Sequence, residues 1–182
     1  MELLKKIAHS IDRLNDGLGR TVAWLTTLLV LLVCAEVVLN LCGRSANWLT
    51  ELEWHVFALI FLLGAGYALR HDRHVRVDLF YNRFSQKDKA LTDLLGSLLF
   101  LIPWCITVGY FSFLYAKKAW HINEHSPDPG GLPARYIIKF AIVIGMLLLL
   151  LQAVSHTIRA GKAYWSKSTT IEPQLPHPKD IL

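Results

Sequence analysis

The sequence predicts an all-α integral membrane protein with four transmembrane helices, and three observations support this fold class. The 182 residues are 53% hydrophobic and 18% charged, whereas soluble domains are about a quarter charged. The charged residues gather between long apolar runs. Two of these runs, LLVLLVC and MLLLLLQA, are apolar on every side of a helix. That pattern is typical of a span in lipid, because a soluble bundle shows apolar residues on one face only.

Hydropathy places the four spans at residues 21–43, 51–70, 90–117 and 134–158, inside a membrane domain of residues 20–160. Each is close to the length of about 20 residues that a helix needs to cross the hydrocarbon. Pro103 should distort the third span, because proline removes a helical hydrogen bond. The segment 161–182 contains three prolines and lacks periodicity, so we expect a flexible cytoplasmic tail.

The distribution of Lys and Arg predicts that both termini are cytoplasmic. Four of these residues precede the first span, six lie between the second and third spans, and four follow the fourth. The opposite side collects only Arg44, Lys117, Lys118 and Arg135. Cytoplasmic loops carry the excess of cations in membrane proteins. The net charge of +5 is then explained by the lipid bilayer, and we expect no nucleic acid partner.

Residues 1–19 are expected to form an interfacial amphipathic helix ahead of the first span. Their apolar side chains fall on one helical stripe, which consists of Leu3, Leu4, Ile7, Ile11, Leu14 and Leu18. This stripe suits a helix that lies on the membrane surface. It suits equally a helix that packs against the rest of the bundle. A shorter stripe of Val77, Phe80, Tyr81 and Phe84 leaves the same two interpretations open.

Two helix starts carry capping patterns. In TELE, Thr50 is expected to cap the second span while Glu53 reaches back to it. In SQKD, Ser85 and Asp88 repeat this pattern before the third span. Both motifs fall at boundaries that hydropathy already places, which favours helices that start there.

The connection before the fourth span, EHSPDPGGLPARYIIK, is rich in turn residues and ends in two cations. Pro133 suits the first turn of a helix, where a missing N–H costs little. Arg135 and Lys139 follow at the mouth of the apolar run. Their side chains could extend to lipid headgroups, or they could contact acidic groups on a partner protein.

Candidate reactive residues are few. Glu36 lies within the first span, and an ionisable group there is a functional candidate by default, so a proton-coupled exporter is one alternative. A redox subunit that anchors haem is another, because the chain has eight histidines. However, His55 and His156 are expected near opposite ends of their spans, too far apart to share one iron. The sequence contains no nucleophile–base pattern and no phosphate-binding loop, so an enzyme is not expected.

Residues 36–78 contain a Trp followed shortly by a Glu, a Leu-Gly-Ala element, and an Arg followed by a His-Val-Arg-Val-Asp element, and a Gly-Leu-Pro element precedes the fourth span. These positions are Trp48, Glu51, Leu63, Gly64, Ala65, Arg70, His74, Val75, Arg76, Val77, Asp78 and Pro133. With these residues nearly the whole chain resembles a known family, the small (DctQ-like) membrane subunit of tripartite ATP-independent periplasmic (TRAP) transporters. Two positions depart from the family pattern. Asn40 stands where the family often has Arg, and Leu52 stands where it commonly has a second Glu beside Glu51.

The resemblance implies a non-catalytic small permease subunit of a secondary transporter, located in the bacterial inner membrane. Its implied partners are a large multi-span permease subunit, for which it is a scaffold, and a periplasmic substrate-binding protein. The implied activity is ion-coupled uptake by symport of an organic acid, expected to be a carboxylate. Sodium coupling would belong to the large subunit, and no cofactor is expected in this chain. We expect partner contacts at Glu36, Glu51, Glu53, Arg135 and Lys139. Small residues suited to close helix packing are Gly64, Gly66, Gly96, Ser97 and Gly145.

Overall fold

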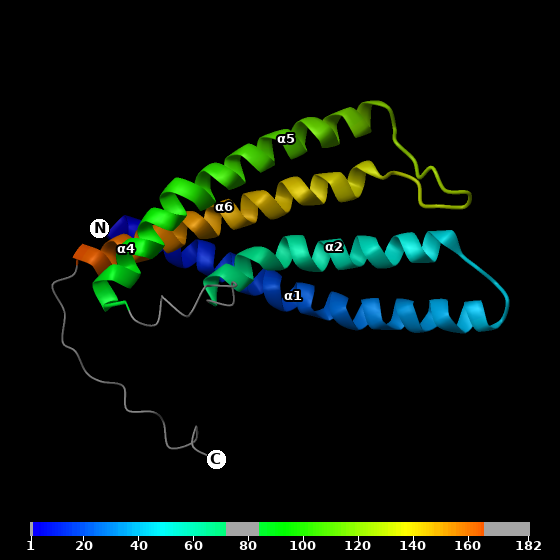
Figure 1. The fold of residues 1–182 in the computed structure, drawn as a ribbon, viewed down its shortest axis with the longest axis horizontal. Helices are drawn as coiled ribbons and strands as arrows, with labels where there is room; N and C mark the ends of the chain where they lie inside the picture. The colour runs from blue at the N-terminus through cyan, green and yellow to red at the C-terminus, as the bar shows by residue number, and fades with distance from the viewer. Residues whose placement is uncertain (1, 72–83, 166–182) are drawn as a thin grey trace, which may run out of the picture.

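Four long helices run side by side along the molecule (Figure 1). The computed structural model describes residues 2–71 and 84–165. The elements are α1 (Glu2–Leu41), α2 (Asn47–Arg70), α4 (Gln86–Gly96), η1 (Ser97–Leu101), α5 (Ile102–His121) and α6 (Tyr136–Trp165). The described residues include four helices that are long and apolar enough to cross a membrane, with α4, η1 and α5 forming one of them. The chain is therefore an all-helical membrane protein. His74, Asp78, the stripe from Val77 to Tyr81 and the tail after Trp165 lie outside the described residues.

The two ends of the bundle differ. α1 begins and α6 finishes at the same end (Figure 1), which we name the terminal end. The opposite end, named the loop end, carries residues 42–46 and 122–135. The start of α1 and the end of α6 therefore lie at the same end of the bundle.

Helix α6 is the centre of the bundle. It packs against α1, α2, α4 and α5, whereas α1 packs along α2 and reaches α6 only with its N-terminal part. In the most apolar window of α6, 44% of the residues are buried, compared with 6% in α1. The buried core is made by Leu69, Cys105, Leu149 and Ala153. Most of the apolar surface of the other helices faces outward, as expected for a protein that packs against lipid or other subunits.

The boundary expected at residue 20 is absent, because α1 continues unbroken from Glu2 to Leu41. At 1.5 Å per residue, this helix is roughly 60 Å long, twice the hydrocarbon thickness. In its N-terminal part, polar side chains face the protein and apolar side chains face outward. Asp12 and Asn15 are buried, whereas Ile7 and Leu14 are 42% and 47% exposed. The expected boundary between this segment and the first span is thus wrong for residues 2–19, whereas their location at the membrane interface stays a prediction. Asp12 and Asn15 pack against α6.

The two capping predictions have different outcomes. Ser85 is the N-cap of α4 and accepts a hydrogen bond from the backbone N–H of Asp88 at 3.2 Å, as predicted. The Thr50 prediction is wrong, because α2 begins one turn earlier, at Asn47, with Ala46 as its N-cap. The Thr50 hydroxyl instead donates to Glu36 on α1. A threonine inside a helix can serve a neighbouring helix, which the local motif does not reveal.

The expected distortion near Pro103 takes the form of a π-helical turn. The turn covers Ser97–Leu101 and ends two residues before the proline. Proline cannot donate to the residue four positions earlier and its ring crowds that carbonyl. A wider turn relieves this conflict, and π-bulges are a recognised cause of helix bending.

Glycines bring α2 close to its neighbours. A Cβ atom at Gly145 would lie 2.9 Å from the backbone oxygen of Leu62, so α2 and α6 touch through their backbones there. A Cβ atom at Gly66 would collide with the side chain of Asn15 on α1. In contrast, a Cβ atom at Gly64 or Gly96 would have nothing within 4 Å. Of the small residues named above, Gly66 and Gly145 therefore serve internal packing.

Candidate functional site

At the loop end, Glu51 connects α2 to the segment 122–135. It is 5% exposed and lies in the second turn of α2. Its carboxylate accepts hydrogen bonds from the Ser126 hydroxyl and from the backbone N–H of Leu132, the latter at 2.6 Å. Asn47 adds a 2.9 Å hydrogen bond to the carbonyl of Pro129. Glu51 therefore fixes the shape of this connection, and its carboxylate is occupied within the chain.

Lys139 also has its partners inside this chain. Its Nζ atom lies 2.5 Å from Oε2 of Glu124 and 3.8 Å from the centre of the Tyr115 ring. The residue is 7% exposed although it carries a full charge. A buried ammonium needs such partners, since an unpaired one is costly. The geometry joins the start of α6 to the end of α5 through this cation.

Arg135 is the more available of the two predicted cations. Its guanidinium lies 5.6 Å from the Trp54 ring on α2, within the range of a cation–π contact. Both residues border an open groove of about 500 Å³ between α2, α5 and α6. Its walls are apolar and aromatic, and Glu124, Arg135 and Lys139 supply its charged lining. Arg135 is not part of an ion pair described in the structure, so its charge remains available to a partner.

Glu36 and Glu53 meet where α1 and α2 approach the loop end. Thr50 donates a 2.5 Å hydrogen bond to Oε1 of Glu36, and Glu53 lies close enough to interact electrostatically with Glu36. The Oε1 atom of Glu53 is buried and has no hydrogen-bond partner in the described part of the chain. Two neighbouring carboxyl groups with an unmet acceptor are suited to a cation or an N–H donor from outside the chain.

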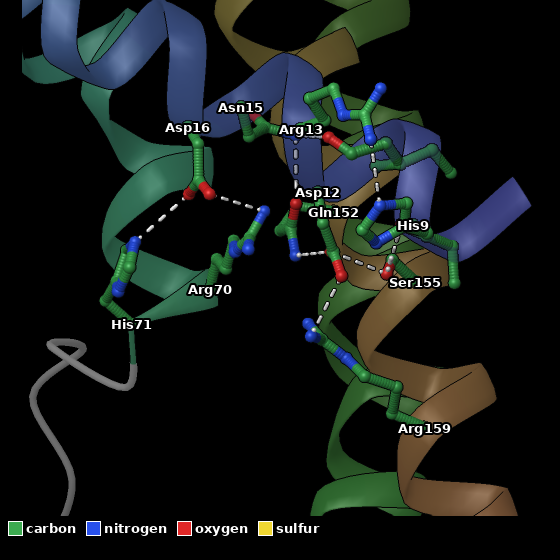
Figure 2. A network of polar contacts seen from close by, with 12 residues as sticks. His9, Asp12, Arg13, Asn15, Asp16, Arg70, His71, Gln152, Ser155 and Arg159 are labelled. Atoms are coloured by element: carbon green, nitrogen blue, oxygen red, sulfur yellow. Dashed lines mark hydrogen bonds and ion pairs between the residues drawn. The ribbon is translucent and has the colours of Figure 1, made fainter. Parts of the chain in front are cut away.

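A buried polar network joins α1 to α6 at the terminal end (Figure 2). Asp12 Oδ1 accepts from Gln152 at 2.9 Å and from Ser155 at 2.8 Å, and Asp12 Oδ2 pairs with Arg159 at 3.0 Å. Asn15 donates to Gln152 at 2.9 Å. Gln152 and Ser155 are completely buried. The network therefore neutralises the Asp12 charge and fixes the N-terminal half of α1 on α6.

The adjacent face of α1 is attached to α2 by a second cluster (Figure 2). Asp16 forms a 2.8 Å ion pair with Arg70 and lies 3.1 Å from Nε2 of His71. Polar residues of α1 thus attach it to two helices: Asp12 and Asn15 contact α6, and Asp16 contacts α2.

Sequence reasoning missed these two clusters, although a signal for them exists. Asp12, Asn15 and Asp16 are spaced three and four positions apart, as are Gln152 and Ser155 in an otherwise apolar run. Such spacing places side chains on one helix face. Polar groups inside a span usually face protein partners. The apolar stripe of residues 3–18 is instead the contact face that the sequence predicts for this helix.

The histidines described here have separate environments. His55 Nδ1 contacts the carbonyl of Glu51, and His156 Nδ1 lies 3.1 Å from the Ser97 hydroxyl. Within residues 2–71 and 84–165, no group of three or more His, Cys, Asp or Glu side chains is arranged to hold a metal ion.

Comparisons with known proteins decide the family. Residues 29–162 match the family described as the DctQ component of tripartite ATP-independent periplasmic transporters. The chain belongs to this DctQ family. It is also 22% identical over 156 residues to the sialic acid TRAP transporter permease protein SiaT of Haemophilus influenzae (strain 86-028NP). That alignment covers 85% of this chain but only 24% of the relative. The DctQ chain is a transporter component and not an enzyme.

The positions that resemble the family have distinct surroundings in this DctQ chain. Arg70 is the partner of Asp16, and Glu51 anchors the connection at the loop end. Trp48 is 47% exposed, and Gly64 faces open space. Pro133 precedes α6, which begins at Tyr136. Arg70 and Glu51 therefore stabilise the fold.

Proposed function

We propose that this chain is the non-catalytic small subunit of a binding-protein-dependent TRAP transporter and a scaffold for the large permease subunit. The observation that carries the proposal is the match of residues 29–162 to the DctQ component. The four-helix architecture supports it, because Asp12 is paired with Gln152, Ser155 and Arg159, which joins the first helix to the last as in a rigid support.

The relative's length supports a large partner. The chain aligns with only 24% of a protein named as a whole permease. In this proposal, a large permease subunit supplies the part of the transporter to which this chain does not align. The exposed apolar surfaces of α1 and α5 provide faces against which such a subunit can pack.

We assign the loop end to the periplasm and the terminal end to the cytoplasm of the inner membrane. The excess of Lys and Arg at the terminal end supports this orientation. A periplasmic binding protein would then approach the loop end, where Arg135 is available to acidic groups. Glu36 and Glu53 are the matching candidates for a cationic partner.

The transported substrate belongs to the class of organic acids in this proposal. The relative is named for sialic acid, and the binding protein and large subunit would select the particular acid. Sodium coupling would likewise reside in the large subunit. This chain would contribute a rigid frame, because its helices are joined by hydrogen bonds at both ends.

Affinity purification of the tagged chain from its native host in mild detergent is the first test. We expect a much larger multi-span permease to be recovered with it. Uptake of an organic acid by proteoliposomes that contain the permease and the binding protein should then require this chain. Recovery of the chain alone in several detergents, with transport by itself, would contradict the scaffold and favour an exporter centred on Glu36.

A substitution tests the proposed contact at the loop end. Arg135→Gln should lower uptake while the yield of the complex stays unchanged, because Arg135 has no ion-pair partner among the described residues of its own chain. Lys118→Gln is the control, since it removes an exposed cation near the same end of the bundle. Equal uptake by the two variants would rule out a specific role for Arg135.

A further inference from the structure

A small groove with a cationic lining lies between the beginning of α1 and the end of α6. It is lined by Ala8, His9 and Asp12 from α1 and by Ile158, Arg159 and Lys162 from α6. The space is about 230 Å³, several times the roughly 30 Å³ that one water molecule occupies in the liquid. The groove is open to the surroundings and joins two elements far apart in the sequence.

The charge balance in this groove is positive. Asp12 is the acidic residue of the lining, and its carboxylate is fully engaged by Gln152, Ser155 and Arg159. Arg159 uses only its Nη1 atom for this pair, although a guanidinium has five N–H donors. Its side chain is 44% exposed. Lys162 is exposed and has no described partner. Two cations therefore offer donors to a ligand in the groove.

His9 adds a donor of defined chemistry. Arg13 Nη2 lies 3.2 Å from His9 Nε2, and a guanidinium can only donate. The Nε2 atom must therefore accept, which leaves the proton of the neutral imidazole on Nδ1. Arg13 also adds a positive charge beside His9, which lines the groove (Figure 2).

The position of the groove corresponds to the headgroup region of a bilayer. α6 contains 30 residues and is roughly 45 Å long, so its end extends past a hydrocarbon core of about 30 Å. Tyr164 and Trp165 lie two and three residues after Lys162, and Trp165 is 77% exposed. Tyrosine and tryptophan concentrate at the level of lipid headgroups. On the other side of the groove, Ile7 presents an exposed apolar side chain.

We propose that this groove binds the phosphate group of an anionic phospholipid. Arg159, already oriented by Asp12, would donate from its unused nitrogens, because guanidinium groups recognise phosphate oxygens well. Lys162 and His9 would complete the set of donors. The bound lipid would bridge α1 and α6 at the point where the Asp12 network holds them together. This site goes beyond the scaffold role and does not depend on it.

Native mass spectrometry of the full chain, with phosphatidylglycerol titrated into mild detergent, tests the site. The double variant His9→Gln, Lys162→Gln removes two exposed donors and leaves the Asp12–Arg159 pair intact. We expect the apparent affinity for phosphatidylglycerol to fall about fivefold or more, as for the loss of a cation near an anionic surface. Lys87→Gln is the matched control, because Lys87 is an exposed cation at the terminal end outside the groove. Lys162→Gln alone replaces the double variant if the latter unfolds at a lower temperature.

Three results would overturn the proposal. The first is equal loss of lipid binding in the Lys87→Gln control, which would mean that general surface charge attracts the lipid. The second is equal affinity for phosphatidylcholine with the same acyl chains. The third is displacement of the lipid by millimolar inorganic phosphate, which would identify a site for soluble anions. Recovery of the large subunit is measured separately, so failure here leaves the scaffold proposal untouched.

Discussion

The side-chain amide of Gln152 donates a 2.9 Å hydrogen bond to the carboxylate of Asp12, although the two residues are 140 positions apart. Gln152 also accepts from Asn15. It is therefore the shared member of a network that attaches the first helix to the last. Asp12 and Gln152 are both buried, so their hydrogen bonds must be made with other protein groups and not with water.

Replacing Gln152 with leucine keeps a side chain of similar size but removes its hydrogen bonds, so it tests how much these hydrogen bonds contribute to stability. The variant leaves Asn15 without its main partner and Asp12 with one donor fewer. An unmet buried polar group costs about 1–3 kcal/mol, so we expect the free energy of unfolding to fall by about this amount. Thermal unfolding in detergent, followed by tryptophan fluorescence, measures the change. Thr21→Val is a suitable control, since Thr21 bonds only to a carbonyl of its own helix. A Gln152→Leu variant as stable as the control would show that the network contributes little.

Two glycines on facing helices predict opposite outcomes for the same substitution. Gly145→Ala places a Cβ atom 2.9 Å from the Leu62 backbone oxygen, so α2 and α6 must move apart. Overpacking of this kind costs about 1–3 kcal/mol, more than the gain of about 1 kcal/mol in helix propensity. Gly64→Ala meets open space and should leave the isolated chain as stable or more stable. Unfolding of both variants in mixed micelles checks this, and equal stability would contradict the close contact.

The helices of this protein could be predicted from hydropathy, because apolar runs of sufficient length have few alternatives in lipid. Each of the four expected spans overlaps one of the four long helices, apart from residues 42–43 and 134–135. What hydropathy missed is the long extension of α1, since residues 2–19 are polar enough to resemble a separate surface helix. Their burial depends on partners 140 positions away, and such tertiary contacts leave only a weak pattern in either segment.

The candidate contact residues were predicted as a group, but their surroundings divide them. Glu51 and Lys139 each have strong partners within the chain. Arg135 lies over the Trp54 ring and interacts with Glu51 only through longer-range electrostatics, and Glu36 and Glu53 lie together. A sequence shows that an ionisable residue stands near a membrane boundary. It does not show whether the folded chain places a hydrogen-bond or ion-pair partner beside that residue. The position of such a partner depends on the path of the connection between spans.

Glu51 should control the order of the segment 122–135. Glu51→Ala removes the acceptor of the Ser126 hydroxyl and of the Leu132 N–H. We expect faster hydrogen exchange at the Leu132 amide and faster proteolysis of this connection, with little change in the helices. Glu53→Ala provides the control, because it removes a carboxylate two residues later whose buried Oε1 atom forms no hydrogen bond with the described residues. Unchanged exchange at Leu132 in the Glu51 variant would show that the connection is held by other contacts.

The pair of Lys139 and Glu124 should behave as a structural unit. Lys139→Gln removes a charged hydrogen bond of 2.5 Å from a residue that is 7% exposed. Such bonds contribute about 1.5–3 kcal/mol, so the yield and thermal stability of the variant should fall. Glu124→Gln should have a similar effect, and the double variant should cost less than the sum of the two, because neither group is then left without an opposite charge. Additive losses in this cycle would show that the two residues act independently. Arg135→Gln, measured beside them, should leave stability unchanged, which separates a cation used within the chain from one available to a partner.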